Sequence, residues 1–355
     1  MRTAEFDYQL PPELIAQTPV EPRDASRLMV VERSAGSISH RRFHDLPQLV
    51  RPGDLLVHNE SRVIPARLFG RKPTGGRVEI LLLRQRTDDT WEALVRGRRV
   101  REGLRLHLLD GPAGRPTGAE AQVIEAGERG MRVLAFDRPV LPLAERVGVT
   151  PLPPYIHTPL ADDGRYQTVY ARAPGSAAAP TAGLHFTPEL LLQLREMDVR
   201  SAFVTLHIGL DTFRPVSEER IEEHHMHTEY CSLTPEVARQ VNQAKLEGRR
   251  VVAVGTTSVR VLETAALAAV GGEACAEACP WQAVSGFDGP TDLFIYPGYR
   301  YRAVDVLLTN FHLPRSTLLM LVAAFAGKEL LDRAYAEAVG ERYRFYSFGD
   351  AMLIL

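Results

Sequence analysis

The chain has 355 residues, a length at which about two domains are usual. Hydrophobic residues make up 45% of the sequence and charged residues 24%, a balance that excludes disordered, collagen-like and coiled-coil proteins. A net charge of −2 does not favour a polyanionic partner unless the basic residues are concentrated in one segment.

Targeting signals are not evident in the sequence. No basic segment followed by an apolar run stands at the N-terminus, so no secretory signal is predicted. The longest apolar stretch, residues 318–326, is shorter than the ~20 residues that cross a bilayer. Three cysteines are too few and oddly numbered for a disulfide framework, which fits a reducing compartment. We therefore expect a cytoplasmic protein that does not associate with membranes.

The basic residues are concentrated near the N-terminal third. Residues 62–105 contain twelve Lys or Arg and five Asp or Glu, a net charge of +7 that leaves −9 for the remainder. Such a segment is what binding a polyanion through one domain requires. An alternative is a solvated arginine surface, because only three residues of the chain are lysine and arginine is its ordinary cation.

The same region predicts a small β-barrel. Short apolar or alternating runs at 78–83, 91–96, 104–108, 121–124 and 131–136 are typical of strands. Turn residues rich in Gly, Pro, Asp and Thr separate them, with no helical period between. We predict an inserted β-barrel domain over residues 67–147.

The remainder, residues 1–66 and 148–355, predicts an α/β domain with a largely parallel sheet and flanking helices. Thr-Pro-Glu at Thr187 and again at Thr234 supplies a helix cap, an N1 proline and an acid in the first turn. Further helices are expected at 258–269 and from about 316 and 329. Strands are expected at 202–208, 251–254, 293–296 and 304–308, so that strands and helices alternate.

Three polar segments, HIG (207–209), GTTS (255–258) and TNFH (309–312), follow predicted strands. Because ligands bind beyond the carboxyl ends of strands in open α/β sheets, these segments are expected to meet at one site. Thr or Ser at the start of a helix is also ordinary capping, and both interpretations stay open. The chain has no G-x-G-x-x-G and no P-loop, which argues against NAD and nucleoside triphosphates.

Histidine and cysteine clusters give weaker signals. His224, His225 and His227, with Cys231 nearby, invite a metal interpretation, but no second compact ligand pair accompanies them, so no metal site is predicted. Cys275 and Cys279 are interpreted as core or surface thiols. The segment 181–186 is either a capped loop or a pocket wall against which a flat ring packs.

A series of segments in chain order resembles one family. They are FDY (6–8) with LP (10–11), Asn59, Arg62, VIPARL (63–68), PLPPYI (151–156), YQTVY (166–170), APTAGLHF (179–186), VTLHIG (204–209), VGTTSVR (254–260), TNFHLP (309–314) and YRFYSFGDAM (343–352). Together they closely resemble the S-adenosylmethionine:tRNA ribosyltransferase-isomerases of queuosine biosynthesis. The resemblance covers essentially the whole chain.

This resemblance implies a transfer of the ribosyl part of S-adenosylmethionine, not of its methyl group. The acceptor is 7-aminomethyl-7-deazaguanine at the wobble position of a tRNA with a GUN anticodon. Adenine and methionine leave, and the product is epoxyqueuosine-tRNA. The family combines an α/β domain with an inserted β-barrel, whose basic surface would bind tRNA phosphates. The resemblance further implies S-adenosylmethionine as cosubstrate, no prosthetic group, no metal and a monomer.

In the mechanism proposed for the family, a base removes a proton from the ribose carbon beside the sulfonium, and a proton donor assists the departing adenine. The amine of the modified base then attacks, and closure of the epoxide expels methionine. Histidine suits proton transfer near neutral pH, so the catalytic candidates are His185, His207 and His312, with the role of each left open.

The other candidates lie in the matching segments or in the basic segment. Arg62 and Arg260 could pair with the methionine carboxylate or a tRNA phosphate. For each hydroxyl, a buried structural role stays open. The substrate-binding candidates are Asn59, Arg62, Thr181, Gly183, Gly209, Thr256, Thr257, Ser258, Arg260 and Asn310. The tRNA-binding candidates are Arg71, Lys72, Arg96, Arg98, Arg99 and Arg101.

Two departures from the family pattern lie beside these segments. Asp211 stands where glycine is usual, and Glu60-Ser61 where an Asn/Asp-Thr pair is common.

Two other classes of function stay open. A non-catalytic tRNA-binding protein would explain the basic barrel but would not need three polar segments at strand ends. An S-adenosylmethionine-dependent RNA methyltransferase would share the cosubstrate. However, this chain lacks the glycine-rich first βα loop that is expected of that class.

Overall fold

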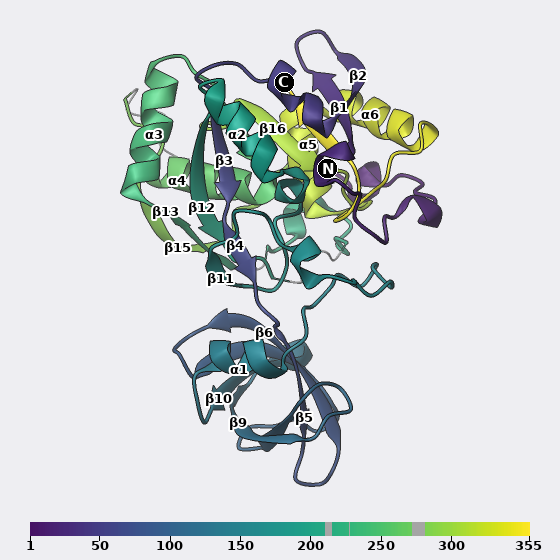
Figure 1. Cartoon of the computed structure of the whole chain (residues 1–355), viewed down its shortest axis with the longest axis vertical. Coiled ribbons are helices and arrows are strands. Elements are labelled where there is room, and N and C mark those ends of the chain that lie inside the picture. Colours follow the sequence, from purple (N-terminus) through teal and green to yellow (C-terminus); the bar gives the residue numbers. More distant parts are fainter. Residues whose placement is uncertain (210–214, 227, 272–280) are drawn as a thin grey trace. The chain divides into compact units, whose positions relative to one another are not determined.

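The computed structural model describes residues 1–209, 215–226, 228–271 and 281–355 (Figure 1). The predictions made for Asp211, His227, Cys275 and Cys279 lie outside these residues. The chain divides into two compact units. Unit 1 comprises Met1–Ser61, Pro154–Arg172 and Pro180–Leu355, and unit 2 comprises Arg62–Pro153 and Ala173–Ala179.

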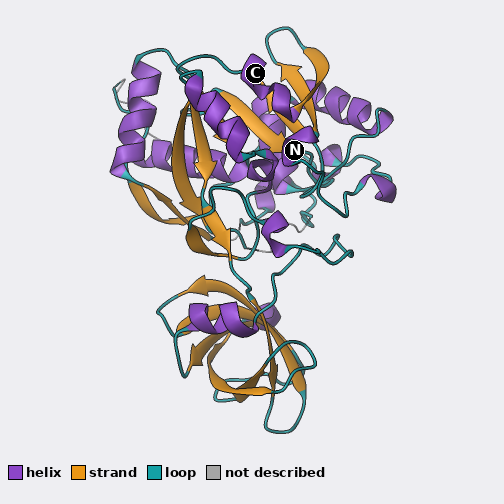
Figure 2. Ribbon diagram, in the orientation of Figure 1, coloured by secondary structure: helices purple, strands orange, loops and turns teal. Residues whose placement is uncertain are grey.

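Unit 1 is built on a sheet in which nine strands of the described chain lie side by side (Figure 2). Four neighbouring strands, β12, β3, β14 and β16, are parallel, and β17 is parallel to β1, whereas the other pairs are antiparallel. In sheet order the strands are β15 (Phe287–Thr291), β13 (Glu229–Leu233), β12 (Arg200–Leu206), β3 (Leu55–Asn59), β14 (Val251–Val254), β16 (Val306–Asn310), β17 (Ala351–Ile354), β1 (Arg27–Glu32) and β2 (Ser37–Arg42).

The helices of unit 1 flank this sheet (Figure 1). Thr187 caps α2 by accepting from the Leu190 N–H, and Thr234 caps α3 by accepting from the Val237 N–H, as the two Thr-Pro-Glu segments predict. The helices are α2 (Pro188–Glu196), α3 (Pro235–Leu246), α4 (Thr256–Ala269), α5 (Thr317–Ala326) and α6 (Lys328–Gly340). Short 3-10 helices are η1 (Thr3–Phe6), η2 (Pro12–Leu14), η3 (Arg23–Ala25), η4 (Phe43–Gln48), η6 (Asp163–Tyr166), η7 (Thr181–His185) and η9 (Ile221–Glu223).

One apolar cluster joins the sheet to η4, η7 and α2. Leu56, Val254 and Leu308 come from three neighbouring strands, and Phe186 and Leu190 pack against them. All five side chains are buried, so this cluster fixes η7 and the start of α2 over the parallel strands.

Several boundaries differ from the prediction; the strand expected at 202–208, for example, is β12, which ends at Leu206. The strand expected at 293–296 is wrong: β15 ends at Thr291, and the Leu293 carbonyl accepts instead from Arg260 Nε at 3.2 Å. Pro290 fits within β15 because this strand lies at the edge of the sheet, where a missing N–H is tolerated. Helix α4 begins at Thr256, two residues earlier than expected, because Gly255 adopts φ +88° directly after β14. Strand β16 begins at Val306 instead of 304.

Unit 2 contains a closed barrel, as predicted. Its order is β10 (Met131–Phe136), β7 (Thr90–Arg96), β6 (Arg77–Gln85), β5 (Arg67–Arg71), β8 (Arg105–Leu109) and β9 (Pro116–Ala126). Strand β9 is followed by η5 (Glu128–Gly130), and α1 (Val140–Val147) follows β10. Backbone bonds from Arg67 N to Val149 O (3.1 Å) and from Val149 N to Arg67 O (2.9 Å) join the two ends of the barrel segment.

A two-stranded sheet formed by β4 (Ser61–Val63) and β11 (Ala173–Ser176) completes the strands of the described residues. The predicted α/β fold with an additional small barrel is thus confirmed. None of the helices in the described ranges is long and apolar enough to span a bilayer.

Candidate active site

The three polar segments predicted to meet lie at one edge of the unit 1 sheet. Adjacent parallel strands are in register, with Val204 opposite Asn59, and His58 and Leu308 both opposite Val254. Their carboxyl ends therefore align, and the residues that follow them lie along the same edge. Segments 207–209, 255–258 and 309–312, together with Asn59, are brought to this edge.

His185 lies at the end of η7, buried between a hydroxyl and an amide. Its Nδ1 is 2.8 Å from Ser26 Oγ, its Nε2 is 3.2 Å from Asn310 Nδ2, and its ring stacks on Phe43. An amide nitrogen only donates, so Nε2 accepts and Nδ1 carries the proton that is donated to Ser26. The Asn310 amide nitrogen also donates to the Tyr346 carbonyl at 3.1 Å, which supports this orientation.

Burial governs the ionisation of His185. Burial, followed by the charges of Arg344 and Arg23, lowers its pKa to about 3. At neutral pH the ring is therefore uncharged, with one nitrogen able to accept a proton.

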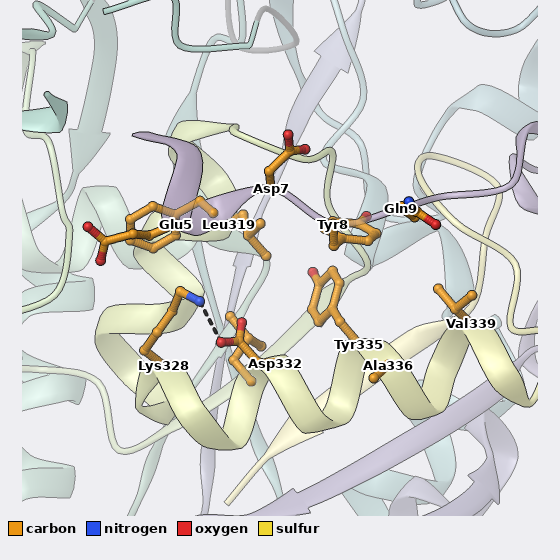
Figure 3. A pocket seen from close by; sticks show the side chains of 12 residues that line it. Glu5, Asp7, Tyr8, Gln9, Leu319, Lys328, Asp332, Tyr335, Ala336 and Val339 are labelled. Atoms are coloured by element: carbon orange, nitrogen blue, oxygen red, sulfur yellow. Dashed lines mark hydrogen bonds and ion pairs between the residues drawn. The ribbon is translucent and has the colours of Figure 1, made fainter. Parts of the chain in front are cut away.

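His312 is fixed through its side chain and through its backbone. Its Nε2 is 2.8 Å from Thr309 Oγ1, and burial lowers its pKa to about 3. The His312 N–H donates to the Tyr335 hydroxyl at 2.9 Å, while the Tyr8 hydroxyl donates to the His312 carbonyl. Figure 3 shows Tyr8 of the N-terminal segment beside Tyr335 of α6, and the two rings meet edge to face.

His207 is the least constrained of the three histidines. Its N–H donates to the Tyr230 carbonyl at 3.1 Å, but its buried Nδ1 has no hydrogen-bond partner among the described residues. Burial lowers its pKa, although the residue remains partly exposed. This ring nitrogen therefore has an unused hydrogen-bonding capacity, as does the buried Nδ1 of His58.

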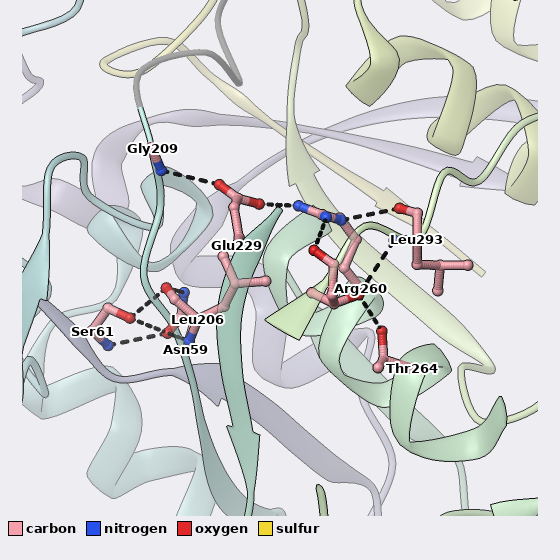
Figure 4. Close-up of polar contacts among 9 residues, drawn as sticks. Asn59, Ser61, Leu206, Gly209, Glu229, Arg260, Thr264 and Leu293 are labelled. Atoms are coloured by element: carbon pink, nitrogen blue, oxygen red, sulfur yellow. Dashed lines mark hydrogen bonds and ion pairs between the residues drawn. The ribbon is translucent and has the colours of Figure 1, made fainter. Parts of the chain in front are cut away.

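Asn59 fastens the end of β3 to the end of β12 (Figure 4). Its Nδ2 donates to the Leu206 carbonyl at 3.0 Å, and its Oδ1 accepts from the Leu206 N–H at 3.1 Å and the Ser61 hydroxyl at 2.8 Å. Glu60 accepts from Arg172 at 2.9 Å. The Glu60-Ser61 departure is thus accommodated, and the Asn59 side chain is fixed through both its oxygen and its nitrogen.

The hydroxyls of the segment from Gly255 to Ser258 differ in whether they have a hydrogen-bond partner in the protein. Ser258 donates to the Val254 carbonyl at 2.8 Å, a local structural bond within the first turn of α4. Thr256 is buried, and the buried Oγ1 of Thr257 has no partner within the described part of the chain. Thr257 therefore keeps the capacity to bind a ligand.

Gly183 permits a close approach within η7. A Cβ added there would lie 2.1 Å from the Tyr170 hydroxyl and 2.8 Å from Thr168 Cγ2. The hydroxyls of Tyr170 and Thr168 are buried, with no hydrogen-bond partner in the described ranges. Thr181, in the same helix, is partly exposed. The 179–186 segment is thus a tightly packed wall at this position.

Arg260 is held in a buried ion pair. Its guanidinium pairs with Glu229, whose Oε1 also accepts from the Gly209 N–H at 3.0 Å (Figure 4). The side chains of Arg260 and Glu229 are 4% and 3% exposed. Gly209 is thereby fixed at the end of the HIG segment. Arg62, the other candidate for an anion, lies in unit 2 and pairs with Glu145 at 3.6 Å.

Two contacts of the candidate site were not predicted from the sequence. Ser26 has no local signal, because its proximity to His185 joins residues 159 positions apart. The contacts of Tyr8 and Tyr335 with the backbone of His312 were also not predicted, although Tyr8 lies in the matching FDY segment. His58 is a further buried histidine with a pKa lowered by burial to about 3, and it packs against Tyr170.

Metal ligands are not assembled in the described ranges. There, no group of three or more His, Cys, Asp or Glu side chains could hold a metal ion. His224 is instead 2.9 Å from Glu218, and burial raises the pKa of the Cys231 thiol to about 12.

The six tRNA-binding candidates lie at the end of β5, in the turn after it, and around the loop after β7. Lys72 donates to the Arg98 carbonyl at 2.8 Å, which joins the two loops, and the five arginines are exposed. Within the described residues none of the six forms an ion pair, whereas Arg84 and Arg86 share Glu92. These six charges are available to an anionic partner.

Comparison with known proteins gives consistent matches over the whole chain. The model of the family described as "Queuosine biosynthesis protein" matches residues 3–354. S-adenosylmethionine:tRNA ribosyltransferase-isomerase from Moorella thermoacetica is 56% identical over 100% of both chains. The protein of the same name from Thermus thermophilus is 56% identical over 99% of this chain and 98% of its own length. A crystal structure of S-adenosylmethionine tRNA ribosyltransferase from Thermotoga maritima, 43% identical, covers 99% of this chain and 100% of its own with a TM-score of 0.55.

Proposed function

The chain belongs to the queuosine biosynthesis family of S-adenosylmethionine:tRNA ribosyltransferase-isomerases, and we propose on this premise how its site carries out that reaction. The enzyme moves the ribosyl part of S-adenosylmethionine onto 7-aminomethyl-7-deazaguanine at the wobble position of tRNA. It isomerises that part to the epoxide of epoxyqueuosine and releases adenine and methionine. S-adenosylmethionine is the cosubstrate.

The observation that carries the proposal is that His207 and His312 follow strands whose carboxyl ends lie on one edge of the unit 1 sheet, and that His185 contacts Asn310 at the same edge. The reaction needs a base for the proton beside the sulfonium and a donor for the departing adenine. Two buried, uncharged imidazoles and a third with an unpaired nitrogen provide groups that accept and return protons.

His207 is the best-placed base. Its Nδ1 has no partner among the described residues, so it accepts a proton without first breaking a protein hydrogen bond. His185 and His312 are each held by a hydroxyl, through Ser26 and Thr309, and such pairs can relay a proton. The neutral Thr257 hydroxyl is a donor for a ribose or base edge.

The tRNA is proposed to bind the exposed arginines of the barrel. Five exposed guanidiniums and Lys72, without ion-pair partners in the described chain, suit contacts with phosphates. The acceptor tRNA carries a GUN anticodon. The protein is proposed to act as a cytoplasmic monomer without metal or prosthetic group.

Chromatography of the products tests the proposal. Purified protein is incubated with S-adenosylmethionine and tRNA bearing 7-aminomethyl-7-deazaguanine, and unmodified tRNA is the control. Adenine and methionine are expected only with the modified tRNA. S-adenosylhomocysteine would indicate a methyltransferase, and no product from folded protein that binds the tRNA would indicate a binding protein.

Alanine substitution separates the three histidines. His207→Ala is expected to abolish adenine release. Adenine release that persists in this variant would assign the base to His185 or His312 instead. Thermal unfolding of each variant shows whether the loss is chemical, since His185 and His312 are buried and contribute to packing.

A further inference from the structure

A narrow pocket of about 20 Å³ opens beside His185 in unit 1. By this measure a single buried water needs ~10–15 Å³, so the pocket holds one small group and not a nucleoside. Its polar lining consists of Arg23, Arg165, Ser26, Ser347 and His185. The lining contains two guanidiniums, two hydroxyls and an imidazole, but no carboxylate.

Backbone carbonyls position Arg23 without neutralising it. Arg23 donates to the carbonyls of Gln167 and Gly164, each at 2.9 Å. Among the described residues no carboxylate lies within ion-pair distance of Arg23, although Glu21 and, more weakly, Asp162 act on it from farther away. Burial, followed by the nearby charge of Arg165, lowers the pKa of Arg23, which indicates two like charges held close together.

Arg165 is held in a similar way. It donates to the Val20 carbonyl at 2.6 Å and pairs with Glu21 at 3.0 Å. The Glu21 side chain is 76% exposed, whereas that of Arg165 is 18% exposed, so the partner is largely solvated. Because the Glu21 carboxylate is largely solvated, it offsets the Arg165 charge only in part and competes with a bound anion for that guanidinium.

We propose that this pocket binds one oxyanion of the substrates, held by Arg23 and Arg165, and so anchors a substrate beside His185. The inference rests on the proposed function, which supplies two such groups, the carboxylate of the methionyl part and a phosphate of the tRNA. Planar guanidiniums suit both because they donate two parallel hydrogen bonds. Arg260 is occupied by Glu229 and cannot serve this role without leaving a buried charge unpaired.

Binding would also change His185. The charges of Arg344 and Arg23 add to burial in lowering its pKa. A bound anion offsets these charges, so the pKa of His185 rises and its Nε2 becomes a stronger base when the substrate is in place. The pocket thus couples anchoring of the substrate to the basicity of the histidine.

Three variants test the site, each in the full-length chain. Arg165→Gln removes a charge while keeping a side chain that reaches the Val20 carbonyl. Glu21→Gln removes the competing carboxylate at an exposed position and is expected to tighten binding severalfold. Arg195→Gln, at an exposed arginine of α2 in the same unit, is the matched control.

Equilibrium binding is measured with three probes: S-adenosylmethionine, decarboxylated S-adenosylmethionine and an anticodon stem-loop RNA. A roughly tenfold loss for Arg165→Gln with S-adenosylmethionine but not with its decarboxylated form assigns the pocket to the carboxylate. A roughly tenfold loss with the RNA, with a salt slope lower by about 1, assigns it to a phosphate.

The proposal is overturned when Arg165→Gln binds all three probes as Arg195→Gln does, or when Glu21→Gln tightens none of them. If Arg165→Gln does not fold, the binding measured with Glu21→Gln, a substitution at an exposed position, still tests the proposal. The proposed function is judged separately by adenine release from the wild type. Wild-type protein that releases adenine while both variants bind normally would refute the pocket and leave the function standing.

Discussion

Gly183→Ala is expected to destabilise unit 1 through one close contact. The new methyl group would lie 2.1 Å from the Tyr170 hydroxyl, 2.8 Å from Thr168 Cγ2 and 3.0 Å from Tyr170 Cζ. Such overpacking of a well-packed core costs about 1–3 kcal/mol. At about 2–4 °C per kcal/mol for a domain of this size, the midpoint of thermal unfolding should fall by roughly 2–12 °C.

Tyr170→Phe provides the decisive second variant. Its buried hydroxyl has no hydrogen-bond partner among the described residues, so removing it alone should change stability little. In combination with Gly183→Ala it removes the 2.1 Å contact but not the contact with Thr168, so it should restore roughly 0.5–1 kcal/mol.

Circular dichroism during heating measures the four members of this cycle. Gly340→Ala is the control, because a Cβ at Gly340 meets no atom within 4 Å. A Gly183→Ala protein as stable as the wild type would refute the reasoning. So would a cost that is unchanged by Tyr170→Phe, because the hydroxyl would then not be the obstacle.

Three further predictions concern charge. Arg260→Met should cost about 3–5 kcal/mol because the buried Glu229 carboxylate loses its cation, and adding Glu229→Gln should recover part of this cost. Equal thermal midpoints for the single and double variants would contradict this expectation. Three buried histidines have a pKa lowered from 6.5 to about 3, so stability is full above about pH 6.5 and falls toward pH 3 as the unfolded chain takes up protons. In denaturant titrations, His58→Phe should reduce the slope of unfolding free energy against pH by about 1.4 kcal/mol per unit between roughly pH 4 and 6, and an unchanged slope would count against a neutral His58. Arg96→Gln should lower the salt slope of tRNA binding by about 1, whereas Arg84→Gln, which removes an arginine already paired with Glu92, should leave it unchanged.

Local signals predicted the elements that depend on neighbours in sequence. Thr187 and Thr234 cap helices because the capped N–H lies three residues away. The barrel strands alternate apolar and polar side chains within each run. Strand β3 was not predicted, although its five residues are all buried, because its apolar run is only three residues long and is followed by His58 and Asn59.

The site was predictable as an edge of the sheet, but not as a set of contacts. Three polar segments after strands were sufficient to expect convergence. The partners of His185 and Arg260 were not, because Ser26 and Glu229 lie 159 and 31 positions away. The sequence therefore could not distinguish a free guanidinium from one in a buried ion pair.

The paired ends of the barrel segment bear on how unit 1 reaches its native topology. Strands β3 and β12 are neighbours in the sheet although residues 60–199 separate them in sequence. Once the barrel has formed, the two backbone bonds between Arg67 and Val149 hold these residues together, so residues 68–148 no longer add to the length of the loop. Shortening the effective loop in this way lowers the entropic cost of joining β3 to β12 by roughly 1 kcal/mol. The barrel is thus a large insertion that adds little to the entropic cost of folding unit 1. A chain in which a short turn replaces the barrel should still assemble the unit 1 sheet.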